Sequence, residues 1–184
     1  MDHSFLALKI HLQSYGALRP EAWHRITTLI TTLQLKPGQH LIREMGSLTY
    51  LATGLMKEFD VHERLKPTIL NFFGVGETVY CITKSHRLYL EAILPTTLFS
   101  LDLVALHTLH LEFEELIKIY RNLRYNYYEK LLLRMFLLEM PPRKRIIHFR
   151  QTHQTLLPFL QKKEMCNYLH LDYDYFVRTY RKLS

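Results

Sequence analysis

Residues 111–139 constrain the fold most, because they predict one long helix with more apolar surface than a small domain covers. One apolar stripe recurs every three or four positions: Phe113, Leu116, Tyr120, Leu123, Tyr127, Leu131, Met135 and Leu138. A second apolar face is formed by Ile117, Ile119, Leu132, Leu133, Phe136 and Leu137. We therefore expect one side of the helix to pack on its own domain and the other to meet a second subunit.

The expected assembly is a homodimer built on this helix. Its predicted interface residues come from the first stripe: Leu116, Tyr120, Leu123, Tyr127 and Leu131. A helix buried wholly within one chain is the alternative interpretation. Pro141 and Pro142 end the helix and mark the boundary to the segment that follows.

The chain before this helix changes from helical to β-type periodicity. Residues 14–33 predict a helix, with Pro20 suited to its first turn. In residues 35–101, short β-rich runs alternate with turn residues, and Gly38, Gly46 and Gly54 stand eight residues apart. The expected strands are residues 39–43, 50–58, 68–73, 78–83, 88–93 and 98–102. This spacing predicts a small barrel or sandwich.

Residues 161–184 predict two short amphipathic helices joined by a tight turn. Asp172 is placed to cap the second helix, since its side chain can accept from free backbone N–H groups in the first turn. The residues expected to pack inward are Met165, Tyr168, Leu169, Phe176, Thr179, Tyr180 and Leu183. This is the pattern of a helix-turn-helix.

Positive charge is concentrated in the same part of the chain. Nine Lys/Arg and three Asp/Glu follow Pro141, a net charge of +6, whereas the whole chain carries +7. A basic surface confined to one segment indicates a polyanion site, and a solvated basic tail is the alternative. We expect double-stranded DNA as the partner. The predicted DNA contacts are Lys162, Lys163, Tyr173, Asp174, Tyr175, Arg178, Thr179, Arg181 and Lys182.

The order of helix, glycine-spaced barrel, long helix and helix-turn-helix resembles the cyclic-AMP receptor protein/FNR family of bacterial transcription regulators. The matching stretches are residues 35–46, 50–61, 74–77 and 161–183. The resemblance implies an α+β fold: a double-stranded β-helix of the cupin-like jelly-roll type within residues 1–110, a dimerisation helix at 111–140 and a DNA-binding domain at 141–184. It also implies that residues 173–182 form the recognition helix of a cytoplasmic homodimer.

The sequence departs from this family where its members bind cyclic AMP. Those members carry a Gly-Glu pair for the ribose and an Arg-Ser or Arg-Thr pair for the phosphate. Here Cys81 takes the place of the carboxylate, and Leu88 follows Arg87. We therefore expect an effector other than cyclic AMP, with candidate binding residues Glu77, Tyr80, Cys81, His86 and Arg87. Glu77 also fits the turn at residues 74–77.

The DNA-binding segment departs from the family too. His170 occupies a turn position where members often have Gly, and a left-handed backbone there tolerates a non-Gly residue without favouring it. Relatives commonly continue into a β-hairpin wing after the recognition helix. The sequence ends at Ser184, so it resembles a compact wingless form.

Enzyme chemistry is not expected. Cupin metal sites use clustered histidines and a carboxylate, but His40, His62 and His86 stand far apart in the barrel segment without a His-x-His pair. Neither a nucleophile motif nor a cofactor signature is present. Cys81 and Cys166 fit small core residues, and no apolar run reaches membrane-spanning length. A ligand-sensing or scaffold dimer that has lost DNA binding is the alternative function.

Overall fold

The computed structural model describes residues 3–41, 44–62, 66–81 and 88–183. Two four-stranded sheets form a barrel, with strand orders β1-β8-β3-β6 and β2-β7-β4-β5, and every strand pair is antiparallel. The strands are β1 (Thr31–Leu35), β2 (His40–Leu41), β3 (Leu48–Thr53), β4 (Met56–Asp60), β5 (Thr68–Phe73), β6 (Thr78–Tyr80), β7 (Leu88–Ala92) and β8 (Thr96–Leu101). The predicted jelly-roll fold is confirmed.

The regularly spaced glycines lie in the turns of this barrel. Gly38, Gly46 and Gly54 have φ angles of 82°, 81° and 98°, a region that other residues rarely adopt. At Gly54 an added Cβ would also lie 2.6 Å from the carbonyl oxygen of Pro95. This turn divides residues 50–58, which were predicted as one strand, into β3 and β4. The β3 and β4 strands consequently belong to different sheets.

Helices occupy both ends of the chain. They are α1 (His3–Gln13), α2 (Pro20–Leu29), α3 (Leu103–Glu112), α4 (Glu114–Glu139), α5 (Pro142–Thr152), α6 (Lys162–Leu169) and α7 (Tyr173–Lys182), with a 3-10 turn, η1, at Leu157–Phe159. The helix predicted at residues 14–33 is partly wrong. Only α2 lies within it, α1 precedes it, and residues 31–33 belong to β1, where they pair with β8.

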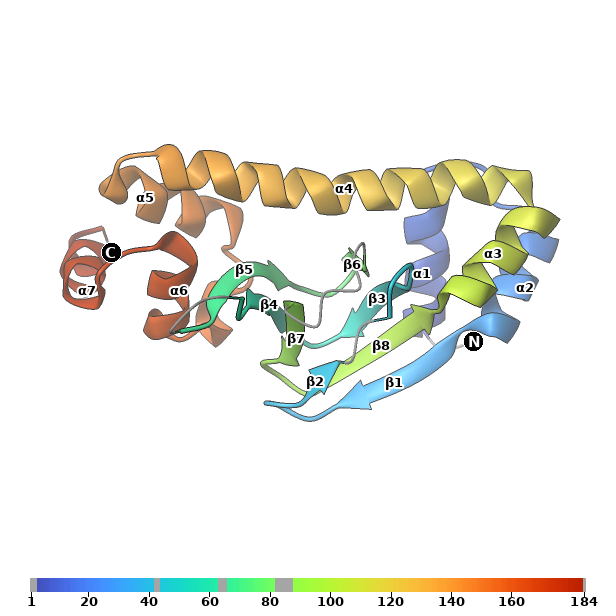
Figure 1. Ribbon diagram of the computed structural model, residues 1–184, viewed down its shortest axis with the longest axis horizontal. Coiled ribbons are helices and arrows are strands. Elements are labelled where there is room, and N and C mark those ends of the chain that lie inside the picture. The colour runs from blue at the N-terminus through green and yellow to red at the C-terminus, as the bar shows by residue number, and fades with distance from the viewer. Residues whose placement is uncertain (1–2, 42–43, 63–65, 82–87, 184) are drawn as a thin grey trace.

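The long helix α4 runs along one side of the whole molecule (Figure 1). Helices α1, α2 and α3 gather at its beginning, the barrel lies beneath its middle, and α5, α6 and α7 lie at its end (Figure 1). The long helix predicted at residues 111–139 is confirmed, but it begins later than predicted. Residues 111 and 112 still belong to α3, and Phe113 has an extended backbone that separates α3 from α4. No helix among the described residues is long and apolar enough to span a bilayer.

Three hydrophobic clusters hold this arrangement together. The first joins α1, α2 and α3 to the sheet that contains β3 and β8, and the second fills the barrel around Leu51, Phe73 and Tyr127. The third joins the β4–β5 face of the barrel to α5, α6 and α7. Because α4 contributes to all three, it mechanically connects the barrel to the C-terminal helices.

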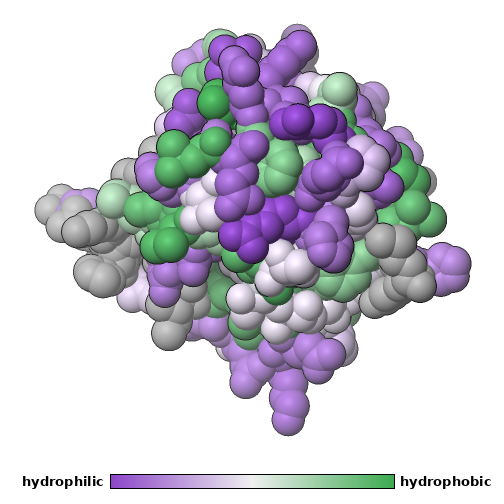
Figure 2. Space-filling model, turned by 90° about the vertical axis from the view of Figure 1, so that its right-hand side faces the viewer, coloured by the Kyte–Doolittle hydropathy of each residue, from purple (hydrophilic) through white to green (hydrophobic). Residues whose placement is uncertain are grey.

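The end of the molecule formed by α1, α2 and α3 is largely hydrophilic, with apolar side chains mainly toward the sides of the view (Figure 2). Two exposed ion pairs lie here: Arg19 Nε is 2.8 Å from Glu115 Oε1, and Arg25 Nε is 3.0 Å from Glu112 Oε2. They link the α2 region to α4 and α3. Exposed pairs of this kind add little stability, so the apolar contacts of the first cluster hold these helices together.

Candidate DNA-binding surface and its contact with the barrel

The unit formed by α6 and α7 is built from local signals in the sequence. At the start of α6, Gln161 and Glu164 form a reciprocal capping box, in which the backbone N–H of Gln161 donates to Glu164 Oε2 at 3.0 Å. At the start of α7, the Tyr175 N–H donates to Asp172 Oδ1 at 3.0 Å, which confirms the predicted cap. His170 takes the left-handed conformation between them, with φ of 51°.

The inner face of this unit is apolar, as predicted. Met165, Tyr168, Leu169 and Phe176 are buried, whereas Thr179, Tyr180 and Leu183 are partly buried. Cys166 is also buried, and burial raises the pKa of its thiol to about 11. It is therefore an unreactive thiol in the core of the unit.

The outer face carries the side chains predicted to contact DNA. All of them are exposed except Thr179, which is partly buried: Lys162, Lys163, Tyr173, Asp174, Tyr175, Arg178, Arg181 and Lys182. The Lys residues lie in the first turn of α6, while Tyr173, Asp174 and Arg178 lie on α7. The arrangement presents cations and hydrogen-bonding groups together on one unit, as a duplex requires.

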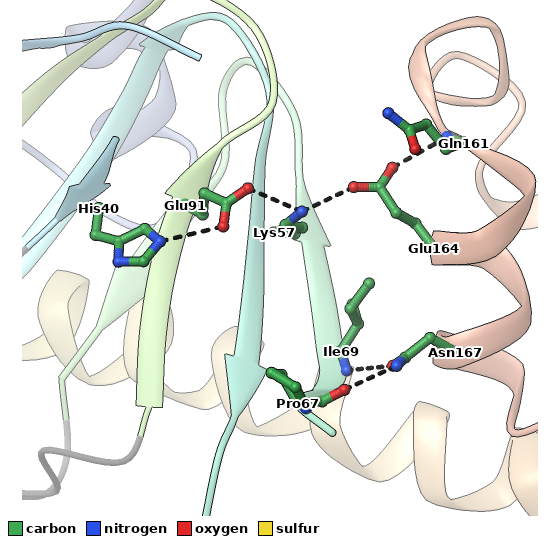
Figure 3. A network of polar contacts seen from close by, with 8 residues as sticks. All are labelled: His40, Lys57, Pro67, Ile69, Glu91, Gln161, Glu164 and Asn167. Carbon is green, nitrogen blue, oxygen red and sulfur yellow. Dashed lines mark hydrogen bonds and ion pairs between the residues drawn. The ribbon is translucent and has the colours of Figure 1, made fainter. Parts of the chain in front are cut away.

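The same unit is docked on the barrel through Asn167 of α6 (Figure 3). Its side-chain oxygen accepts from the Ile69 N–H at 2.6 Å, and its amide nitrogen donates to the Pro67 carbonyl at 2.8 Å. The β5 strand lies at the edge of its sheet, so its outer backbone groups lack a neighbouring strand. Asn167 supplies the hydrogen bonds that such a strand would have made.

An ion-pair chain extends this contact across the barrel surface (Figure 3). Lys57 Nζ of β4 lies 2.9 Å from both Glu164 Oε1 of α6 and Glu91 Oε1 of β7, and Glu91 Oε2 contacts His40 Nε2 at 3.1 Å. Burial lowers the pKa of Lys57, but the hydrogen bonds with Glu164 and Glu91 outweigh it, so the pKa is raised overall. Lys57 is therefore a cation that joins the barrel to α6.

Beside these polar contacts, the two units share an aromatic cluster. Phe72 of β5 lies 5.3 Å from Tyr168 of α6 and 6.1 Å from Phe149 of α5, between ring centres. His153 stacks on Phe149 at 4.4 Å. Arg134 of α4 adds a further link, because its Nη2 donates to the Tyr168 carbonyl at 3.3 Å. The helix-turn-helix is thus packed against both the barrel and the end of α4.

The residues predicted for effector binding contact different parts of the structure. Glu77 accepts from the Gly74 N–H and pairs with Lys130 of α4, so it holds the turn as well as contacting the helix. Tyr80 lies beneath Arg124, with the guanidinium carbon 5.9 Å from the ring centre. Cys81 is buried, whereas His86 and Arg87 lie outside the described residues. The described residues of this set therefore do not form one common binding site.

A buried polar cluster that the sequence analysis missed lies within the barrel. Glu58 of β4 is fully buried; its Oε1 accepts from the Tyr127 hydroxyl at 2.6 Å and its Oε2 accepts from Asn71 Nδ2 at 3.0 Å. Tyr127 belongs to α4, so this cluster couples the barrel interior to the long helix. No group of three or more His, Cys, Asp or Glu suited to a metal occurs within the described part of the chain.

The dimer-interface residues predicted on α4 require correction. Leu116, Tyr120, Leu123 and Tyr127 are buried against the barrel and α3 of the same chain, and Leu131 is partly buried against the barrel core. Apart from Leu133, the large apolar side chains left exposed on α4 form a different stripe at helical spacing: Ile117, Tyr125, Tyr128, Leu132, Met135 and Phe136. These exposed side chains also exclude the alternative interpretation, in which the helix is wholly buried within one chain.

No protein-family model and no curated protein matches the sequence. Solved structures do match in three dimensions. FixK2 from Bradyrhizobium japonicum is 16% identical with a TM-score of 0.69 and 84% of each chain covered. A protein from Eubacterium rectale assigned to the Crp/Fnr family of transcriptional regulators is 13% identical with a TM-score of 0.70, over 90% of this chain and 83% of that one.

CLP of Xanthomonas campestris, a c-di-GMP responsive global regulator, is also similar. It is 13% identical with a TM-score of 0.69, over 90% of this chain and 91% of the other. These matches extend over most of each chain. The chain therefore has the fold of the Crp/Fnr transcription regulators, as the resemblance in its sequence predicted.

Proposed function

We propose that this chain is a homodimeric DNA-binding transcription regulator of the Crp/Fnr type that responds to an effector other than cyclic AMP. The observation that carries the proposal is the α6–α7 unit, whose apolar side chains are buried while its basic and aromatic side chains remain exposed. In a helix-turn-helix, the second helix enters the major groove and the first crosses the DNA backbone. Arg178 on α7 then reads bases, and Lys162 and Lys163 on α6 contact phosphates.

The dimer follows from the exposed stripe of α4. Ile117, Leu132 and Phe136 are 48%, 50% and 60% exposed, an apolar surface along a helix that extends the length of the molecule. Pairing two copies along this stripe removes it from water and places two α7 helices in one assembly. Two recognition helices match the two half-sites that dimeric regulators bind.

Docking of α6 on the barrel suggests how the regulator is switched. The α6 and α7 side chains assigned to DNA stay exposed when α6 is docked, but Lys57 and Asn167 fix where these helices lie relative to the barrel, and therefore relative to the second copy. In the proposed mechanism the two α7 helices do not fit both half-sites in this docked position. Release of α6 from the barrel frees it for DNA. An effector acts by binding one arrangement more tightly than the other.

Base reading by Arg178 is tested on an operator selected from a random duplex library. Arg178→Ala should cost about 1–3 kcal/mol of binding free energy on the selected operator and little on random duplex, because a bidentate guanine contact carries sequence information. Fluorescence anisotropy measures both affinities. Arg143→Ala, an exposed arginine on α5 outside this unit, is the matched control. Equal losses of Arg178→Ala on both duplexes would assign Arg178 to phosphate contact instead.

Cyclic AMP at millimolar concentration should leave the melting temperature unchanged. The residue at position 81 is a buried cysteine and supplies no carboxylate for a ribose. Differential scanning fluorimetry with cyclic AMP, and with adenosine as the control, measures this. A saturable rise in melting temperature with cyclic AMP alone would contradict the proposed effector class.

A ligand-sensing or scaffold dimer without DNA binding is the second candidate. The contacts of Asn167 and Lys57 that hold α6 on the barrel favour it, because a permanently docked unit would keep the two α7 helices in a position that does not fit a duplex. Binding to random duplex at low salt separates the two functions. A regulator binds under these conditions, and a scaffold does not.

A further inference from the structure

A cavity of about 580 Å³ lies where the barrel, α4 and the α5–η1 segment meet, and we call it the junction cavity. Its volume is in the range of small-molecule sites. Leu55 and Phe72 line it from the barrel, Leu133 and Leu137 from α4, and His148 and Leu156 from the C-terminal domain. A molecule bound here would therefore touch all three parts of the chain at once.

The walls of the junction cavity are mainly apolar, and some of this surface remains in water. Leu133 is 60% exposed and Phe159 is 51% exposed, although both line the cavity. Large apolar side chains around a hollow are typical of ligand sites, because an apolar ligand covers them. An occupant with an apolar body would fit this surface.

The charges of the cavity are few and unbalanced. Lys130 and Arg134 are the cations among the described lining residues, and Glu77 is the carboxylate, which gives a net charge of +1. Lys130 is paired with Glu77, and its ammonium group also lies 4.8 Å from the Phe73 ring centre. The Arg134 guanidinium lies over the Tyr168 ring at 5.2 Å. A ligand with a single negative charge would balance this lining.

Two histidines of the lining remain suited to hydrogen bonding with such a ligand. Burial, followed by the nearby Lys130, lowers the pKa of His153 to about 4, so its imidazole is neutral at physiological pH. The Nδ1 atom of His148 is buried and has no hydrogen-bond partner among the described residues. An unsatisfied buried nitrogen is costly, and a polar ligand group would remove that cost.

We propose that the junction cavity binds an amphipathic monoanion, an aliphatic carboxylate with a chain of medium length. The apolar walls take the chain, and the Arg134 end takes the carboxylate. Because the site requires α5, α4 and the barrel to be packed together, the ligand stabilises the docked arrangement. Under the proposed function, it acts as an inhibitor of DNA binding.

The test compares three probes that share an eight-carbon chain: octanoate, 1-octanol and octylammonium. Isothermal titration calorimetry on the full chain, without DNA, measures each affinity. Octanoate should bind about tenfold tighter than 1-octanol or better, since charge-assisted hydrogen bonds exceed neutral ones. Octylammonium should bind most weakly. Equal affinities for octanoate and octylammonium, or no binding of octanoate, would overturn the proposal.

Variants locate the site. Thr155→Trp places a bulky ring at an exposed lining position and should abolish octanoate binding, while Arg134→Gln should reduce octanoate to the affinity of 1-octanol. Arg121→Gln, exposed on α4 outside the cavity, should change neither. Octanoate binding that survives Thr155→Trp would place the site elsewhere, and this result holds even if Arg134→Gln does not fold. Because no DNA is present, failure here leaves the DNA-binding proposal standing.

Discussion

Replacing Leu132 and Phe136 together with Glu should convert the dimer into a folded monomer. The two side chains are 50% and 60% exposed in the single chain, so the substitutions leave its own core intact. In a symmetric dimer each change occurs twice, and truncating a side chain at the centre of an interface costs about 2 kcal/mol or more. Burying four carboxylates adds a further penalty. Sedimentation velocity measures the change in mass, and circular dichroism measures the retained fold.

Lys118→Glu is the matched control, since it changes charge at an exposed position of the same helix outside the stripe. It should remain a dimer. A dimer that persists in the Leu132→Glu/Phe136→Glu variant would show that α4 does not form the interface. The same substitutions at Leu116 and Leu123 would be a poor test, because these side chains are 0% and 1% exposed and a charge there unfolds the chain.

Asn167→Ala should release α6 from the barrel and raise the affinity for DNA. The substitution leaves the Ile69 N–H and the Pro67 carbonyl without the hydrogen bonds of 2.6 Å and 2.8 Å that Asn167 makes. An unsatisfied backbone group that stays buried costs about 1–3 kcal/mol, so the docked state becomes roughly tenfold or more less favourable. Amide hydrogen exchange at Ile69 and duplex affinity measure the two consequences.

Asn126→Ala is the matched control for this substitution. Asn126 donates to the Tyr15 hydroxyl at 2.6 Å, remote from the contact between α6 and β5. It should affect neither the exchange of Ile69 nor the affinity for DNA. Unchanged exchange at Ile69 in Asn167→Ala would show that the contact does not hold the docked state, and unchanged DNA affinity would show that docking does not regulate binding.

The features that the sequence predicted correctly depend on neighbouring residues. Asp172 caps α7 because the start of a helix needs a hydrogen-bond acceptor at that position. The chain turns at Gly54, where a side chain would collide with the Pro95 carbonyl. Residues 31–33 were assigned to a helix because their period continued that of α2. They form a strand instead, because they pair with β8, which lies far along the chain.

The features that the sequence did not predict depend on tertiary contacts. Two apolar stripes were visible on α4, but which of them is covered is fixed only when Leu116 and Leu123 pack into the cluster between the N-terminal helices and the sheet that contains β3 and β8. Asn167 resembled any exposed helix residue, and its bonding to β5 requires that strand to be an edge. The burial of Glu58 could not be predicted from its neighbours in the sequence, because its hydrogen-bond partners Asn71 and Tyr127 come from two other elements.

DNA binding by α6 and α7 is tested most directly by titrating duplex with the wild-type chain and Lys163→Ala across a series of salt concentrations. For the wild type, log K should fall linearly with log salt, because each phosphate that a cation neutralises releases condensed counterions. Lys163→Ala should flatten this slope by about one unit for each phosphate that is no longer neutralised, in both subunits. Absence of any salt-dependent binding by the wild type, together with no duplex enriched from a random library, would contradict the account.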